Sequence, residues 1–187
     1  MRVVAIVGLP GSGKSAAASV AEDAGIPVVT MGDVIRDVCR ERGLELTEDN
    51  LGTVATELRE EGGDAAVAER ALPLIEKYRS NEPVVLVDGI RGIAEVELFT
   101  EEFGDEFFLV SIDVPFETRL ERIQNRGRDP TAETVRDLKR RDRRERGYGM
   151  DAAMASADRT IENTGGLDEF EATIRSILLE EPPEIDR

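Results

Sequence analysis

The chain has 187 residues, of which 40% are hydrophobic, enough for one compact domain with a core of its own. It contains no histidine and a single cysteine, Cys39, which excludes histidine-based triads, histidine general bases, internal disulfides and structural zinc sites. Any catalysis therefore depends on carboxylates, lysine, arginine, hydroxyls, backbone amides and a hard cation such as Mg²⁺.

The charge is strongly acidic but unevenly distributed. The formal net charge is −16, and three lysines stand against 21 arginines, which predicts adaptation to high salt and disfavours nucleic-acid binding. Residues 119–146 alone hold ten arginines and one lysine against six acidic residues. No apolar run approaches the roughly 18 residues of a membrane span, and the first run is too short for a signal peptide, so we expect a cytoplasmic protein.

Strand-like and helix-like segments alternate along the chain. Continuous apolar runs predict buried strands, and alanine-rich or amphipathic stretches predict helices. In chain order we expect a strand over 2–7, a helix over 14–25, a strand over 27–30, helices over 32–42, 47–61 and 64–79, a strand over 84–88, a helix over 93–103, a strand over 107–114, helices over 115–125 and 131–146, a weak strand over 159–163 and a helix over 167–181.

Residues 8–15, Gly-Leu-Pro-Gly-Ser-Gly-Lys-Ser, match the spacing of a phosphate-binding P-loop between a predicted strand and a predicted helix. Glycines let successive backbone N–H groups turn toward phosphate oxygens, and the following helix adds its positive N-terminal end. We expect Lys14 to reach the β- and γ-phosphates and the Ser15 hydroxyl to coordinate Mg²⁺. The sequence therefore predicts ATP and Mg²⁺ as cofactors, with nucleotide-binding residues Gly8, Gly11, Ser12, Gly13, Lys14, Ser15 and Ala16.

The P-loop and the order of elements together predict the fold class. It is an α/β fold of the P-loop NTPase type, a three-layer α/β/α sandwich with a parallel sheet of about five strands. We expect residues 1–187 to form a single domain. Residues 31–82 hold more helix than a crossover between two strands needs, which predicts a helical insert that binds a second substrate.

Two other classes of P-loop protein are disfavoured. A guanine-reading Asn-Lys-x-Asp motif is absent, because Gly13, Glu76 and Leu138 precede the three lysines. Gly89 follows Asp88 at the end of a predicted strand, where a motor-type ATPase usually has glutamate.

Four further segments carry a recognisable pattern. They read TMGDVIR at 30–36, VDGIR at 87–91, DVPFETRLERIQNR at 113–126 and IENTG at 161–165. With the P-loop they resemble the nucleotide kinases, which include adenylate and dephospho-CoA kinases, and most closely a poorly characterised archaeal kinase-like family related to both. The resemblance implies ATP-dependent phosphoryl transfer, a helical acceptor-binding insert over 31–82 and an arginine-rich lid over 119–146.

The resemblance also implies roles for single residues. Arg36 would bind the acceptor's phosphate, and Arg91 the acceptor or the transferring phosphate. Asp88 would position a magnesium-bound water below Lys14 and Ser15. In the lid and the base pocket the implied residues are Arg122 on the adenine, Arg126 facing the phosphates, Arg141 closing with the lid, and Asn163 and Gly165 beside the base.

Phosphoryl transfer gives a physical reason for an arginine cluster in an acidic protein. The reaction needs water excluded and positive charge around the migrating group, and guanidinium groups bind phosphate oxygens in pairs. Arg122 and Arg126 are four residues apart and so share a helix face. Alternatively, residues 136–146 form a solvated helix with internal charge balance, and Asn163 is only a turn residue; the balancing acids would be Asp137, Asp142 and Glu145.

The sequence leaves three functions open. A phosphate acceptor such as AMP needs no general base, whereas a ribose hydroxyl as in dephospho-CoA benefits from one. Asp33 is the only acid in residues 30–36 and is the predicted base, although it alternatively only complements the helix dipole. The third function is an adenylate-kinase-like ATPase that acts in macromolecular assembly, such as ribosome maturation, and hydrolyses ATP without a small acceptor.

Overall fold

Strands and helices alternate along the chain in the computed structural model, which describes residues 1–125 and 135–179. Each predicted strand is present to within two residues of its expected bounds. The elements are β1 (Arg2–Val7), α1 (Lys14–Asp23), β2 (Val28–Thr30), α2 (Met31–Glu41), α3 (Glu48–Gly62), α4 (Ala66–Arg79), β3 (Val84–Asp88), α5 (Ile93–Phe103), the 3₁₀ turn η1 (Gly104–Glu106), β4 (Phe107–Asp113), α6 (Phe116–Asn125), α7 (Val135–Gly147), α8 (Met150–Ala155), β5 (Arg159–Glu162) and α9 (Leu167–Leu179).

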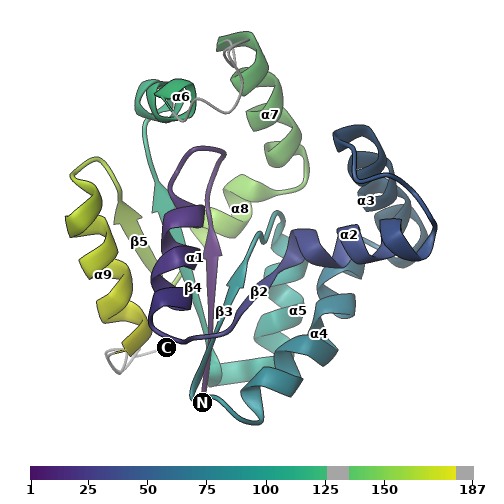
Figure 1. The fold of residues 1–187 in the computed structure, drawn as a ribbon, viewed down its shortest axis with the longest axis horizontal. Coiled ribbons are helices and arrows are strands. Elements are labelled where there is room, and N and C mark those ends of the chain that lie inside the picture. Colours follow the sequence, from purple (N-terminus) through teal and green to yellow (C-terminus); the bar gives the residue numbers. More distant parts are fainter. Residues whose placement is uncertain (126–134, 180–187) are drawn as a thin grey trace.

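The five strands form one parallel sheet in the order β2-β3-β1-β4-β5. Helices cover both faces, which confirms the predicted three-layer α/β/α sandwich (Figure 1). After β1 the chain forms β2 at one edge of the sheet, and β3 then lies between β2 and β1. The next strand, β4, pairs with β1 on its other side. The strand order therefore reverses around β1, and ligands of open α/β sheets bind at such a point, beyond the carboxyl ends of the strands.

The central strand β1 is buried on both faces because its apolar residues are continuous. Val3, Ala5 and Val7 pack with α2, α3, α4, α5 and α8 in one hydrophobic cluster. Val4 and Ile6 point to the opposite face and pack with α1 and α9. The two-residue period of a strand thus divides one apolar run between two cores, and both hold the P-loop rigidly at the end of β1.

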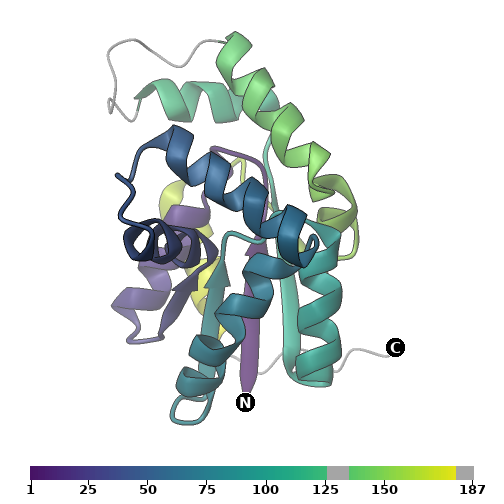
Figure 2. The same cartoon turned by 90° about the vertical axis from the view of Figure 1, so that its right-hand side faces the viewer.

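The carboxyl ends of the strands point toward two groups of helices. Helices α6 and α7 lie above these ends, and α2 and α3 lie to one side (Figures 1 and 2). The helices α2, α3 and α4 separate β2 from β3, where the insert was predicted. In the described part of the chain, no helix is both long and apolar enough to cross a membrane.

Two short elements were not predicted. The 3₁₀ turn η1 has three residues and α8 has six, too few for either to show a clear periodicity in the sequence. Gly149, with φ of 91°, ends the turn after α7 and lets the chain start α8 in a new direction. The first four residues of the helix predicted over 131–146 lie outside the described residues.

Candidate active site

The P-loop connects β1 to α1 and is closed by a backbone hydrogen bond of 3.1 Å from Ser12 N to Leu9 O. Gly13 precedes α1 with φ of 116°, a conformation that side chains rarely adopt. A Cβ atom at Gly13 would lie only 2.6 Å from the Nδ2 atom of Asn163. Glycine is therefore required here both for the turn and for the close approach of the residue behind the loop.

Lys14 and Asp88 meet at the carboxyl ends of β1 and β3. The Nζ atom of Lys14 donates to the carbonyl oxygens of Gly8 at 2.5 Å and Leu9 at 3.4 Å. Burial lowers the pKa of Lys14, while the carboxylates of Asp88 and Glu145 act in the opposite direction. Burial raises the pKa of Asp88, against the attraction of Lys14. The two groups are thus electrostatically coupled, as the predicted phosphate site requires.

The residues present fit a magnesium ion held through phosphates and water. Among the described side chains, Asp88 Oδ1 and Ser12 Oγ are buried without a hydrogen-bond partner, and an unpaired buried acceptor is costly unless a ligand or water satisfies it. Ser15 is exposed in the first turn of α1. Residues 1–125 and 135–179 contain no group of three His, Cys, Asp or Glu that could cage a metal. Mg²⁺ commonly takes only one or two protein ligands beside phosphates, so this donor set is adequate.

Asn163 ties the end of β5 to the P-loop. Its buried Nδ2 atom donates to Ser12 O at 2.8 Å, and its backbone N donates to Asp113 O at 3.0 Å. Arg122 donates to Asn163 Oδ1 at 3.4 Å, which brings together two residues predicted for the adenine site. Asn163 and Gly165 also line a hollow of about 180 Å³ beside α9. The structure thus gives Asn163 a contact that sequence reasoning missed, and its role beside the base stays a prediction.

Arg119 is the buried connection between α6, α7 and the P-loop. Its guanidinium group binds both carboxylate oxygens of Asp142 at 2.9 and 2.6 Å, and its side chain is only 3% exposed. The same group donates to Val114 O at 3.2 Å and to Pro10 O at 3.0 Å. Sequence reasoning placed Arg119 in the lid but gave it no role. Its position one turn before the predicted Arg122, on the same helix, was the available signal.

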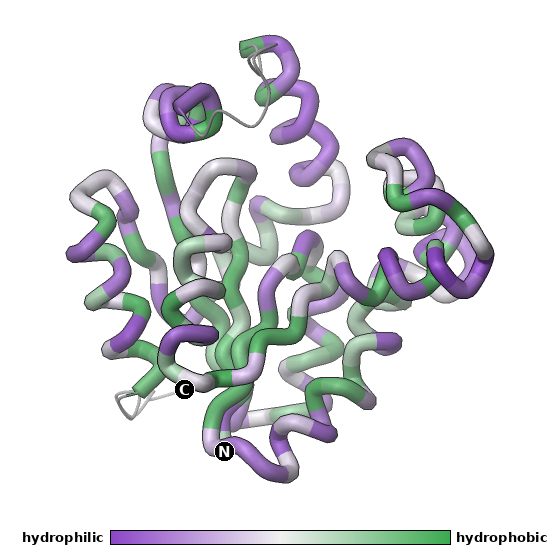
Figure 3. The backbone as a smooth tube through the Cα atoms, in the orientation of Figure 1, coloured by the Kyte–Doolittle hydropathy of each residue, from purple (hydrophilic) through white to green (hydrophobic). Residues whose placement is uncertain are grey.

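Helix α7 is more than a solvated charged helix. Figure 3 shows it as hydrophilic, in contrast to the hydrophobic strands. Its carboxylates Asp142 and Glu145 are nonetheless buried, and they pair with Arg119 and Arg91 on other elements. The pairs of Arg140 with Asp137 and of Arg144 with Glu145 lie within α7, as the solvated-helix alternative expects. The acids therefore dock α7 onto the core. Arg126, a predicted lid residue, lies outside the described residues.

A cavity of about 350 Å³ opens between α2, α3, α7 and the loop after β3. Arg36, Arg91 and Arg141, all predicted from the sequence, line it together. Arg91 and Arg141 both lower the pKa of Lys14, so they lie within Coulombic range of the phosphate loop. Asp33 is exposed at the start of α2 and forms an ion pair with Arg36 one turn later. Arg36 and Arg91, the predicted acceptor-binding residues, thus share one cavity, whereas Asp33 is not among the residues that line it.

Arg59, Arg144 and Tyr148 also line this cavity and were not predicted. Arg59 donates to Glu95 at 3.4 Å and lies over the Tyr148 ring at 4.7 Å. The other oxygen of Glu95 accepts from Arg91 N at 2.7 Å. Burial raises the pKa of Glu95, against these donors. No local motif marks the set, because α3, α5 and the turn after α7 are brought together only by the tertiary fold.

Close packing fixes the loop that carries Arg91. A Cβ atom at Gly92 would lie 2.2 Å from Tyr148 O, so only glycine permits this approach. Arg91 Nη1 donates to Glu145 Oε1 at 2.6 Å across the same contact. The loop after β3 is thus held against the end of α7.

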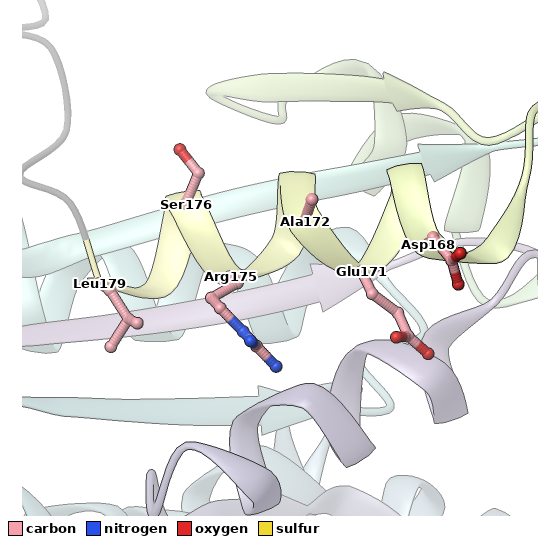
Figure 4. A pocket seen from close by; sticks show the side chains of 6 residues that line it. All are labelled: Asp168, Glu171, Ala172, Arg175, Ser176 and Leu179. Atoms are coloured by element: carbon pink, nitrogen blue, oxygen red, sulfur yellow. The ribbon is translucent and has the colours of Figure 1, made fainter.

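A hollow of about 520 Å³ runs along the outer face of α9 (Figure 4). Side chains of this single helix line it, including Asp168, Glu171 and Arg175, and none was predicted as a site residue. The convergent polar groups of a ligand site are found instead around the P-loop and the arginine cavity.

The P-loop at the central strand and the parallel sheet around it define a P-loop protein of kinase-like fold. A family model described as an AAA domain matches residues 7–139. A UPF0200/UPF0201 protein of Archaeoglobus fulgidus is 52% identical over 179 residues, covering 96% of this chain and 55% of that relative. A UPF0200 protein of Halobacterium salinarum is 49% identical over 183 residues, covering 98% and 95%. The chain therefore belongs to the AAA domain family and to the archaeal UPF0200 family. It spans about half the length of the Archaeoglobus relative.

Solved structures support the same fold. TT1252 from Thermus thermophilus matches with a TM-score of 0.61 and 20% identity, covering 97% of this chain and 98% of that one. Shikimate kinase from Acinetobacter baumannii in complex with shikimate matches with 0.56 and 19%, covering 95% and 92%. A gluconokinase from Sinorhizobium meliloti 1021 matches with 0.54 and 17%, covering 94% and 90%. At identities this low, the structural matches establish the P-loop kinase fold. They do not identify the substrate.

Proposed function

We propose that this protein transfers the γ-phosphoryl group of Mg·ATP to a small acceptor of nucleotide type, such as a nucleoside monophosphate or a dephospho-CoA-like molecule, in the cytoplasm. The observation that carries this proposal is the arginine-lined cavity, two of whose arginines, Arg91 and Arg141, act electrostatically on Lys14. An ATPase needs a water at this position, whereas a cavity of about 350 Å³ accommodates a second substrate.

Different residues in and around the phosphate loop would bind different parts of Mg·ATP. Backbone N–H groups at Gly11 and Gly13 and the start of α1 would surround the phosphates. Lys14 would leave its present carbonyl partners to bind the β- and γ-phosphates, and Ser15 and Asp88 would hold Mg²⁺ directly and through water. Bound Mg²⁺ supplies charge neutralisation between the phosphates. Arg122, beside Asn163, is proposed to cover the adenine.

Arginines would stabilise the transferring group. The bond between the γ-phosphorus and its bridging oxygen breaks while the acceptor oxygen forms a new bond to phosphorus. Arg91 and Arg141 lie near Lys14 and would neutralise the charge on the migrating group, and Arg126 is proposed to join them from the lid. Arg36 would hold the acceptor's own phosphate. For a hydroxyl acceptor, Asp33 would take the hydroxyl proton, because no histidine is present for this step.

The test is ATP consumption with Mg²⁺ in molar KCl, with AMP, with dephospho-CoA and with no acceptor. Each product is identified by mass. A phosphorylated product from one acceptor is the expected result. ADP without any phosphorylated acceptor would reject both named substrates, and stimulation of that hydrolysis by a macromolecular partner would favour an ATPase that acts in assembly.

A matched variant pair separates the two acceptors. Replacing Asp33 by Asn should abolish transfer to a hydroxyl but leave transfer to AMP largely intact, because phosphate oxygens need no base. Asp37→Asn, which alters the equivalent exposed ion pair one turn further along α2, is the control. Equal losses in both variants would remove the proposed role of Asp33.

A further inference from the structure

The cavity lined by Arg36, Arg91 and Arg141, called the arginine cavity here, indicates the chemistry of the acceptor more directly than the P-loop does. Gly32, Ile35, Arg36, Leu51, Gly52, Ala55, Arg59, Arg91, Arg141, Arg144 and Tyr148 line it. We propose that this cavity recognises its acceptor through a phosphate ester and an apolar body, with Arg59, Arg144 and Tyr148 as additional binding residues, and that it does not read the edge of adenine or cytosine. This inference rests on the proposed function and narrows its substrate class to phosphate monoesters.

The first argument is charge. Four of the five arginines share three carboxylates: Arg36 pairs with Asp33, Arg59 with Glu95, and Arg91 and Arg144 with Glu145. None of these carboxylates is among the residues that line the cavity, whereas all four of their arginine partners are. The cavity therefore retains positive charge even before Arg141 is considered. A phosphate dianion offers more oxygens and more negative charge to several guanidinium groups than a single carboxylate such as that of shikimate does.

The second argument is the kind of polar group present. Within the part of the chain that the structure describes, no Asn, Gln, Ser, Thr, Asp or Glu lines the cavity. Amides and carboxylates are the side chains that distinguish the edges of adenine and cytosine from those of other bases, and the hydroxyl of Tyr148 is the one hydroxyl among the side chains that line the cavity in the described part of the chain. The remaining surface is apolar, from Ile35, Leu51 and Ala55, with the half-buried ring of Tyr148 beside them. This surface packs against a sugar or a ring without identifying it.

The third argument is preorganisation. Glu95 is 1% exposed and joins Arg59 of α3 to the backbone of Arg91 in the loop after β3. Tyr148 lies under the guanidinium group of Arg59, which fixes that group from the opposite side. The guanidinium group of Arg59 and the backbone of Arg91 are thus held in place before the acceptor arrives, so less ordering entropy is lost on binding. Glu95 also accepts from the backbone of Gly92, so it caps the start of α5 while it holds the Arg59 guanidinium group at the cavity.

Binding to the protein saturated with Mg·ADP tests the proposal, because ADP fills the P-loop first. Calorimetric titrations use AMP, CMP, UMP and ribose 5-phosphate as phosphate esters, with adenosine, ribose and shikimate as comparisons. We expect the four esters to bind within about tenfold of one another, and the comparisons at least about tenfold more weakly. A preference of more than tenfold for one base, or adenosine binding as tightly as AMP, would overturn the inference.

Variants test the residues directly. Arg36→Ala and Arg59→Ala should each weaken all four esters by about tenfold or more. Arg40→Ala is the control on α2, where an exposed arginine pairs with Asp37 outside the cavity, and it should change binding less than twofold. If Arg59→Ala unfolds the chain around buried Glu95, Arg36→Ala still tests the proposed acceptor site, because the side chain of Arg36 is 41% exposed.

Arg144→Ala and Arg140→Ala form a second pair on α7. The former should lose ester binding, and the latter, whose side chain is 68% exposed and paired with Asp137, should not. Retained binding in both Arg36→Ala and Arg144→Ala would overturn the inference. Failure of Mg·ADP itself to bind would reject the proposed function, whereas failure of the esters to bind the Mg·ADP-loaded protein would reject only the acceptor class.

Discussion

Breaking the buried pair between Arg119 and Asp142 should destabilise the protein and loosen the P-loop together. In Asp142→Ala, a guanidinium group that is 3% exposed loses both carboxylate oxygens. Losing one partner of a buried ion pair costs about 3–5 kcal/mol. Arg119 keeps the carbonyl oxygens of Val114 and Pro10, so we expect the lower end, about 3 kcal/mol, or roughly 6–12 °C in melting temperature.

Urea denaturation at fixed molar KCl measures this loss, and Asp137→Ala is the matched control. Asp137 lies on the same helix in an exposed pair with Arg140, so its loss should cost less than about 1 kcal/mol. A double-mutant cycle with Arg119→Met isolates the pair itself. If Asp142→Ala is no more destabilising than Asp137→Ala, or if the cycle shows no coupling, the view that this pair docks α7 is wrong.

The remaining predictions concern single groups and salt. Burial raises the pKa of Asp88, so Mg·ADP affinity should fall as pH decreases through a midpoint above the ordinary value of about 3.9; Asp88→Asn should bind weakly at every pH. A raised folded-state pKa means that the charged carboxylate destabilises the folded protein at neutral pH, so ligand-free Asp88→Asn should melt higher than the parent, and a lower melting temperature would contradict this sign. Asn163→Ala removes the bond to Ser12 O and should weaken Mg·ADP binding about tenfold in calorimetry, while Asn81→Ala, which loses only an exposed bond to Lys77 O, should not. Thermal stability should rise between 0.1 and 2 M KCl as self-repulsion at a net charge of −16 is screened, and an unchanged melting temperature would argue against adaptation to high salt.

The sheet and the P-loop were predictable because their signals are local. Continuous apolar runs define the strands, and the glycine spacing before Lys14 defines the loop between β1 and α1. The same holds for the position of Asp88, since a polar residue that ends a buried strand next to the P-loop must lie beside it. Each of these inferences needs only a segment and the rule that parallel strands end at one edge.

The second half of the site was predictable only in part. Arg36 and Arg91 followed from short segments, but Arg59 and Tyr148 join them through contacts between residues far apart in sequence. Glu95 illustrates the difficulty, because a glutamate near the start of a helix is usually read as an exposed charge favourable to the dipole. Its burial depends on contacts with Arg59 of α3 and with the loop after β3, which no periodicity in α5 specifies.

The sequence of the charged helix α7 allows two interpretations, and only the tertiary structure distinguishes them. From the sequence, its acids balance its own arginines, and the exposed pair of Arg140 with Asp137 does so. The buried acids Asp142 and Glu145 instead bind arginines of α6 and of the loop after β3. Charge patterns along a helix give the neighbours at three and four residues but not which face another element covers.

The most direct test of the central claim compares the lysines of the chain in Mg·ATP binding by calorimetry. The claim is that Lys14 lies in a working phosphate site, while Lys77 is an exposed residue of α4. We predict that the parent protein and Lys77→Ala bind Mg·ATP alike and that Lys14→Ala binds at least about tenfold more weakly. Absence of Mg·ATP binding in the parent, or equal affinity in Lys14→Ala, would contradict the account.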